Sequence, residues 1–162
     1  MIKVYLDSNV DVKLIKKTVK NIFGDVEIKF LQWPVDKRNK NIKDFGLPAG
    51  EITWSDDNLT WEESNFTWAD YSPTEKYEQV IQIIGKNNRR DCIHFDVAIK
   101  NKCHFFLTED KDFLQKRDQL EVLSCVEIFD PSKHLDEFIE SLKKMLIESN
   151  LFIEDKDDSL IL

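Results

Sequence analysis

The chain lacks any apolar run long enough to cross a membrane. Its 162 residues contain no stretch close to the roughly 18 consecutive apolar residues that a spanning helix requires. The amino terminus leads straight into a strand-like segment and shows no signal-peptide pattern. These two absences argue against a membrane protein and predict a cytoplasmic one.

Cysteine is scarce and has no pattern. The three cysteines, Cys92, Cys103 and Cys125, are an odd number and show no CxxC spacing. A disulfide framework needs an even set, and a zinc site typically shows paired cysteines or histidines. We therefore expect three reduced thiols, buried as small apolar side chains.

Basic residues are fewer than acidic ones, and the net charge is −8. Its distribution is uneven: residues 51–78 hold eight acids and one base, and residues 148–162 hold five acids and one base. The rest of the chain carries a net charge of +3. Phosphate contacts require lysine and arginine, so this mildly basic body keeps RNA among the expected partners.

Apolar residues alternate between strand and helix periodicity along the chain. Strands are predicted at 2–6, 26–33, 103–107, 120–123 and 126–129. Helices are predicted at 12–22, from a start at 72–75 to a stop at Gly85, at 91–102, from 113, and at 131–147. In the first helix the predicted apolar face comprises Val12, Leu14, Ile15, Val19 and Ile22. Alternating strands and helices predict a three-layer α/β/α fold with a mainly parallel central sheet.

One domain, residues 1–150, is expected, with an acidic tail at 151–162 and an insertion at about 46–72. The insertion repeats a Thr-Trp pair with a period of seven, at Trp54, Trp61 and Trp68. These rings either cover an edge of the domain or bind a protein partner. Stacking on single-stranded bases is disfavoured because the surrounding carboxylates repel phosphates.

Three carboxylates occupy positions where parallel α/β folds bind ligands. Asp7 closes the run 2–6, Asp110 follows the run 105–108, and Asp91 opens a helix. Acids beyond the carboxyl ends of strands can converge on one rim. Each could instead cap a helix. Two unit charges about 4 Å apart repel by about 4 kcal/mol at an effective dielectric near 20, so convergence would call for a cation or a raised pKa.

These segments resemble the PIN domain, a family that includes toxin-antitoxin ribonucleases and RNA-processing nucleases. The resemblance rests on Leu6-Asp7-Ser8-Asn9-Val10, on Asp91-x-x-His94-x-x-x-Ala98, and on Thr108-x-Asp110-x-Asp112-Phe113. The segment 126–138 is similar to the family's closing strand, proline and helix. The family has a further acid on an intermediate helix, for which Asp36 and Glu51 are the only candidates here.

The resemblance implies a metal-dependent endoribonuclease, of toxin type or otherwise. It implies metal ligation and catalysis by Asp7, Asp91 and Asp110 with support from Asp112, and phosphate or loop contacts by Ser8, Asn9 and Thr108. Hard carboxylate ligands without a Cys/His set favour Mg²⁺ or Mn²⁺. Substrate steering is expected from basic side chains, chiefly Arg89, Arg90 and Lys111, with Lys37, Arg38, Lys40 and Lys116 as further candidates.

Several alternatives stay open. The chain could be a catalytically weak or inactive PIN-like module that binds a protein partner or antitoxin through its insertion, and it could form a homodimer. An aspartyl-phosphate phosphotransferase is disfavoured because the residue two positions after Asp7 is Asn9. His94 lies near the face of Asp91, but a packing role is favoured. Asp96 projects about 140° away from Asp91 and is not an obvious ligand.

Overall fold

The computed structural model describes residues 1–7, 9–31 and 73–150. Ser8, the predicted insertion at 46–72 and the predicted tail at 151–162 lie outside these residues, as do Lys37, Arg38 and Lys40. No helix among the described residues is long and apolar enough to span a membrane.

In the part of the chain that the structure describes, a four-stranded sheet lies at the centre. Its strands are β1 (Ile2–Leu6), β2 (Ile28–Leu31), β3 (Phe105–Leu107) and β4 (Glu127–Phe129), in the order β2-β1-β3-β4. Every neighbouring pair is parallel. The predicted α/β fold with a parallel sheet is therefore confirmed in its general form.

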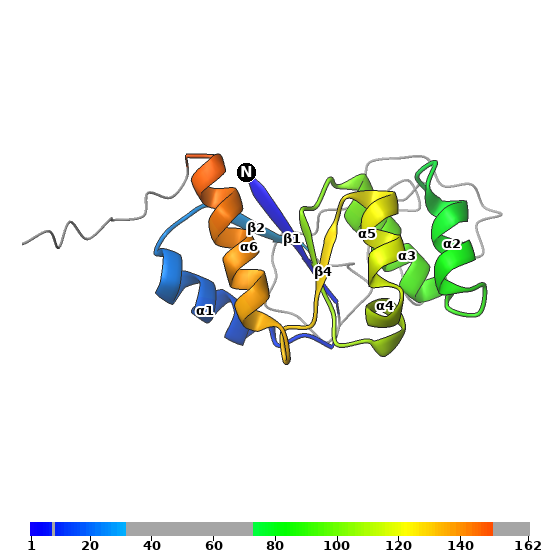
Figure 1. Ribbon diagram of the computed structural model, residues 1–162, viewed down its shortest axis with the longest axis horizontal. Helices are drawn as coiled ribbons and strands as arrows, with labels where there is room; N and C mark the ends of the chain where they lie inside the picture. Colours follow the sequence, from blue (N-terminus) through cyan, green and yellow to red (C-terminus); the bar gives the residue numbers. More distant parts are fainter. Residues whose placement is uncertain (8, 32–72, 151–162) are drawn as a thin grey trace, which may run out of the picture.

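Within the described residues, six helices connect and cover the strands. They are α1 (Val12–Phe23), α2 (Tyr77–Ile84), α3 (Arg89–Lys100), α4 (Lys111–Gln115), α5 (Arg117–Ser124) and α6 (Leu135–Glu148). Figure 1 shows α1 and α6 on one side of the sheet, and α2, α3, α4 and α5 on the other.

Side chains alternate between the two faces of the central strands. In β1, Val4 and Leu6 pack in one buried cluster with α1 and α6, whereas Tyr5 packs in another with α2, α3 and α5. In β3, Phe106 stacks on Tyr5 with ring centroids 5.1 Å apart, and Phe105 lies in the opposite cluster. This alternation follows from the two-residue period of a strand, and it explains why successive residues are apolar at Val4–Leu6 of β1 and throughout β3.

The prediction of a strand at 120–123 is wrong, because these residues belong to α5. Leu120 is buried and Leu123 is partly buried against the same cluster, at the spacing of one helical turn, while Val122 points to solvent. Cys125 ends the helix in a left-handed conformation, and its N–H donates to the carbonyl of Glu121. A short apolar run is compatible with both helix and strand periodicity, so tertiary packing determined that this segment is helical.

Two further expectations require correction. Leu14 and Ile22 were placed on the buried face of α1, but they are 52% and 48% exposed. The helix buries Val12, Ile15 and Val19, as predicted, together with Phe23, and these four lie on one side at 3.6 residues per turn. All three cysteines are free, as expected, but Cys125 is exposed.

Candidate carboxylate site at the carboxyl edge of the sheet

Asp7 continues β1 at the carboxyl edge of the sheet. Its N–H donates to the carbonyl of Leu107 over 3.0 Å, so it lies directly beside the end of β3. Its side chain is buried, and Oδ2 accepts a hydrogen bond from the hydroxyl of Thr108 over 2.8 Å. Asp7 does not cap α1, because Asp11 performs that role by accepting from the N–H of Leu14.

Thr108 holds two acidic segments together. Its fully buried hydroxyl donates to Asp7 and accepts a hydrogen bond from the N–H of Asp110 over 3.0 Å. A second link runs between the same loops, since Asn9 Oδ1 accepts from the N–H of Glu109 over 3.1 Å. The polar groups of Thr108 and Asn9 that were predicted to meet substrate are thus engaged in positioning the loops that carry the acids.

Asp110 is the N-cap of α4. Its Oδ1 accepts a hydrogen bond from the N–H of Asp112 over 2.8 Å, which is the standard capping contact. The capping alternative is therefore realised at this one position. A capping carboxylate still has a second oxygen and a full negative charge, so capping does not remove Asp110 from the acidic cluster.

Asp91 lies in the first turn of α3, where the positive end of the helix dipole favours a negative charge. Its pKa is nevertheless raised to about 6. Burial is the main cause, followed by the charges of Asp110, Asp7 and Asp112, while Arg90 acts in the opposite direction. Four carboxylates from three segments, called the rim acids below, are therefore near enough to repel one another.

The raised pKa of Asp91 predicts a pH-dependent stability in metal-free buffer. The folded state takes up a proton at about pH 6 and the unfolded state only near pH 4, so unfolding free energy should rise as pH falls through this window. The expected gain is about 1–2 kcal/mol, after discounting for the solvent contact of this half-buried group. Urea denaturation with a chelator across this pH range measures it.

Asp91→Asn should remove this gain, because an amide does not titrate. Asp118→Asn is the matched control, since Asp118 is an exposed acid in the first turn of α5. The control should keep the pH dependence of the wild type. Parallel profiles for wild type and Asp91→Asn would contradict the clustering of charge around Asp91.

The donor chemistry of the rim acids suits a hard cation such as Mg²⁺ or Mn²⁺, which prefers carboxylate oxygens. Their positions, however, do not make up a complete set of metal ligands. Within residues 1–7, 9–31 and 73–150, no group of three or more His, Cys, Asp or Glu side chains is positioned to hold a metal ion. The acids thus form an electrostatic cluster without a preassembled ligand set.

Three of the predicted basic residues lie at helix starts that also carry rim acids. Arg89 and Arg90 are exposed at the start of α3, and Lys111 is exposed at the start of α4. These helix starts also carry Asp91 and Asp112. Lys116 is used structurally, because its Nζ donates to the carbonyl of Ile84 over 3.1 Å.

His94 and Asp96 both serve the core. His94 is buried, and its Nδ1 lies 2.5 Å from the hydroxyl of Tyr5, in agreement with the favoured packing role. Asp96 is fully buried and accepts hydrogen bonds from both the N–H and the hydroxyl of Thr74. It ties the segment before α2 to α3, which gives this buried acid a structural role and agrees with its exclusion as an obvious ligand.

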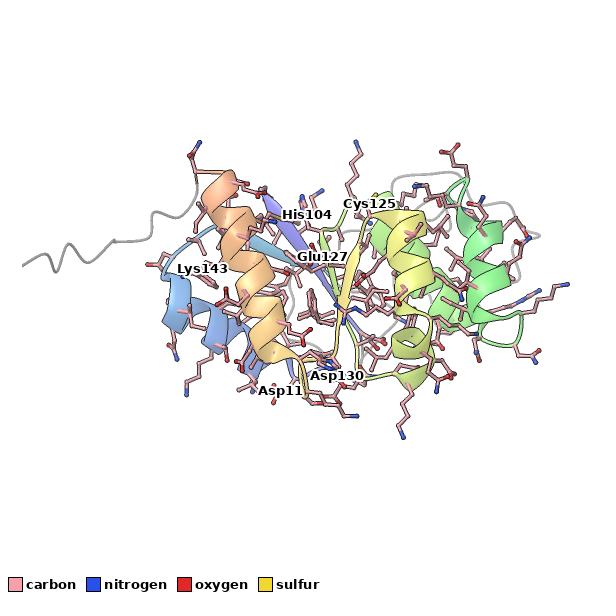
Figure 2. All side chains as sticks on the ribbon, viewed as in Figure 1. Asp11, His104, Cys125, Glu127, Asp130 and Lys143 are labelled. Atoms are coloured by element: carbon pink, nitrogen blue, oxygen red, sulfur yellow. The ribbon has the colours of Figure 1, made fainter. Side chains whose placement is uncertain are left out.

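Asp130 is a buried carboxylate that sequence reasoning missed. It directly follows β4, and the N–H of Thr108 donates to the carbonyl of Phe129, so Asp130 lies along the same edge as Asp7 and Thr108. Figure 2 shows it with Asp11 at the end of the molecule where the strands finish. Its Oδ1 accepts from the N–H and hydroxyl of Ser132, so it organises the turn into α6. Its position after a strand-like run was the available signal.

Comparisons with models of known protein families, with curated proteins and with solved structures found no match to this chain.

Proposed function

We propose that this protein is a metal-dependent endoribonuclease with a three-layer, PIN-like arrangement. The observation that carries the proposal is the hydroxyl of Thr108, which joins Asp7 at the end of β1 to the loop that bears Asp110. Nothing in helix capping requires this link between two strand ends. It concentrates negative charge at the sheet edge where α/β folds bind ligands.

The electrostatics of Asp91 support the same function. Its carboxyl group comes from a third segment and feels the charges of Asp7, Asp110 and Asp112. Crowded carboxylates cost stability unless a cation or a proton compensates them, and residues with strongly perturbed pKa values are enriched at functional sites. A divalent cation bound among these carboxylates would offset this cost.

Asp7, Asp91 and Asp110 would hold the ion, with Asp112 as a further support. A bound Mg²⁺ or Mn²⁺ would supply an activated water and stabilise the charge that develops on a phosphodiester. The protein's own part is to fix the carboxylates: Thr108 holds Asp7, and the cap of α4 fixes Asp110. Burial at the edge of the core also lowers the local dielectric and strengthens these interactions.

RNA as substrate and a toxin-type role rest on the resemblance to the PIN family and on the charge pattern. Arg89, Arg90 and Lys111 are exposed beside the helix starts that carry Asp91 and Asp112. They are placed to meet phosphate groups that approach the acids, which would otherwise repel the RNA backbone. A cytoplasmic location fits a nuclease of this kind.

A second candidate is a PIN-like module with weak or no activity that binds a protein partner. The observation in its favour is that the described acids do not already form a set of metal ligands. Asp110 is also occupied as a helix cap. In this alternative the insertion at 46–72 binds the partner, and the rim acids no longer hold a metal ion.

The two candidates predict different responses to Mn²⁺. For the nuclease, saturating Mn²⁺ should raise the melting temperature of the wild type, since a ligand that binds the folded state stabilises it. Asp110→Asn should raise metal-free stability by about 1 kcal/mol, or roughly 2–4 °C, because it removes a repelling charge and asparagine still caps a helix. The same change should reduce both the Mn²⁺ shift and RNA cleavage. Melting curves and a labelled-RNA assay measure these effects.

Asp118→Asn again serves as the control, because it removes an exposed acid from another helix start. It should leave the Mn²⁺ shift and the cleavage rate unchanged. Equal melting temperatures with and without Mn²⁺, for wild type and Asp110→Asn alike, would reject the metal site. The inactive binding module would then be the better account.

A further inference from the structure

Helix α1 is strongly basic in a chain that is acidic as a whole. It contains four lysines and no acidic residue, whereas the net charge of the chain is −8. All four lysines are exposed, and they are Lys13, Lys16, Lys17 and Lys20. At 3.6 residues per turn they fall within about 100° of the helix circumference, next to the buried side of α1. They form one continuous surface, called the lysine flank below.

The lysines do not simply fill the surface that α1 leaves exposed. The remaining exposed positions carry the uncharged residues Leu14, Asn21 and Ile22. Lysines that served only to keep the helix soluble would be spread over the whole exposed side, including the places of Leu14 and Ile22. Their concentration on one flank instead creates a local field of one sign, which is how a protein attracts a negatively charged partner.

The positive charges of this flank are available to a partner. Among the described residues, Lys13 and Lys17 form no ion pair. Lys20 pairs with Asp25 over 3.4 Å, but both side chains are exposed, so the pair contributes little. Lys16 Nζ lies 5.7 Å from the ring centroid of Phe30, a contact that does not neutralise its charge. No described acid therefore compensates the lysine flank to a large extent.

The lysine flank begins at the edge of the sheet that carries the rim acids. Lys13 lies in the first turn of α1, and Figure 2 shows the N-cap, Asp11, at the end of the molecule where the strands finish. The contact between Lys16 and Phe30 turns the flank toward β2, which neighbours β1, the strand that leads to Asp7. From this edge the four lysines extend over about 10 Å at 1.5 Å per residue.

We propose that the lysine flank of α1 binds the phosphate backbone of RNA and guides the strand to the rim acids. The proposal deepens the nuclease function and rests on it, because it takes RNA as the substrate. A lysine meets phosphate as a point charge on a flexible stem and does not read base edges, so this contact is independent of RNA sequence. It also offsets the repulsion between the rim acids and the approaching phosphates.

An anionic membrane surface fits this helix less well than RNA does. A basic helix that binds membranes inserts an apolar face between the lipids. The apolar face of α1 is already used in the core, since Val12, Ile15 and Val19 are at most 5% exposed. What α1 offers to a partner is therefore charge, and the rim acids at one end of the flank favour a phosphodiester as that partner.

Binding of a labelled single-stranded RNA to the full chain, measured in chelator over a range of salt concentrations, tests the proposal. Lys13→Gln combined with Lys17→Gln should weaken binding at least about 10-fold at about 50 mM salt. The slope of log affinity against log salt should become shallower by about 1.4, because each phosphate contact on a single strand contributes about 0.7. Lys13→Arg combined with Lys17→Arg keeps the charge and should retain both the affinity and the slope.

Lys102→Gln combined with Lys144→Gln is the matched control. Both lysines are exposed and lie away from the carboxyl edge, Lys102 just after α3 and Lys144 in the last turns of α6. The control should bind RNA as the wild type does. Equal losses in the control and in the α1 variant would overturn the proposal, because net charge alone would then explain binding. So would the absence of RNA binding at low salt, and tight binding to phosphatidylserine vesicles in that case would assign the flank to a membrane surface.

The chelator keeps this result separate from that of the proposed nuclease. Unchanged RNA binding by Lys13→Gln combined with Lys17→Gln, with normal Mn²⁺-dependent cleavage, rejects the role of the lysine flank alone. A weakened and shallower salt dependence without any Mn²⁺-dependent cleavage rejects the nuclease alone. Where cleavage occurs, the α1 variant should raise KM and leave kcat unchanged, because the contact is made equally in the ground state and the transition state.

Discussion

Asp7→Asn should abolish metal-dependent RNA cleavage while leaving the fold intact. The amide is a poorer ligand for a hard cation, yet its oxygen can still accept the hydrogen bond from Thr108. Removing a group that merely hydrogen-bonds to a metal ligand costs about 10–100-fold in metal affinity or activity. Removing the charge of the ligand itself should therefore lower cleavage by at least about 100-fold. Single-turnover cleavage of a labelled RNA at saturating Mn²⁺ measures the effect.

Asp11→Asn is the matched control for this experiment. It makes the same chemical change four residues away, at the exposed N-cap of α1, where asparagine caps as well as aspartate. Cleavage by Asp11→Asn should equal that of the wild type. Wild-type cleavage by Asp7→Asn would remove Asp7 from the site and reject the proposed nuclease mechanism.

Thr108→Val should lower both stability and activity. Valine keeps the shape but deletes the donor to the buried carboxylate of Asp7 and the acceptor for the N–H of Asp110. Hydrogen bonds to charged groups contribute about 1.5–3 kcal/mol, so a loss of about 2 kcal/mol, or roughly 4–8 °C in melting temperature, is expected. Cleavage should fall by about 10–100-fold, because Thr108 positions Asp7 and the loop of Asp110.

Thr74 offers an unusually close control for Thr108. Its hydroxyl also donates to a buried carboxylate, that of Asp96, and also accepts from the N–H two residues later, that of Lys76. Thr74→Val should therefore cost similar stability far from the rim acids. If both variants lose cleavage in proportion to stability, Thr108 has only a structural role. A selective loss for Thr108→Val supports its positioning of the acids.

The positions of the acids could be predicted because each follows from local sequence and from a general property of parallel sheets. Asp7 ends an apolar strand, and β1 and β3 are neighbours whose carboxyl ends share one edge. The repulsion expected for converging acids agrees with the raised pKa of Asp91. What the acids do chemically was not determined in this way, because function depends on ligands that strand patterning does not specify.

The roles of several polar residues could not be predicted, since they depend on partners far away in sequence. Asp96 is hydrogen-bonded to Thr74, and His94 to Tyr5, and no local sequence pattern predicts either pair. Asp110 could be a cap or a rim acid by sequence, and the structure makes it a cap that also lies within reach of Asp91.

The sequence by itself determined the α/β class, the parallel strands and the acids at their ends, because periodicity and strand ends are local properties of the chain. Only the tertiary structure decided that 120–123 is helical, that Leu14 and Ile22 face solvent, and that the hydroxyl of Thr108 connects Asp7 with Asp110. Each of these outcomes depends on which surfaces meet across the sheet. An apolar side chain is buried, and a polar one is paired, only where a neighbour from another segment provides the contact.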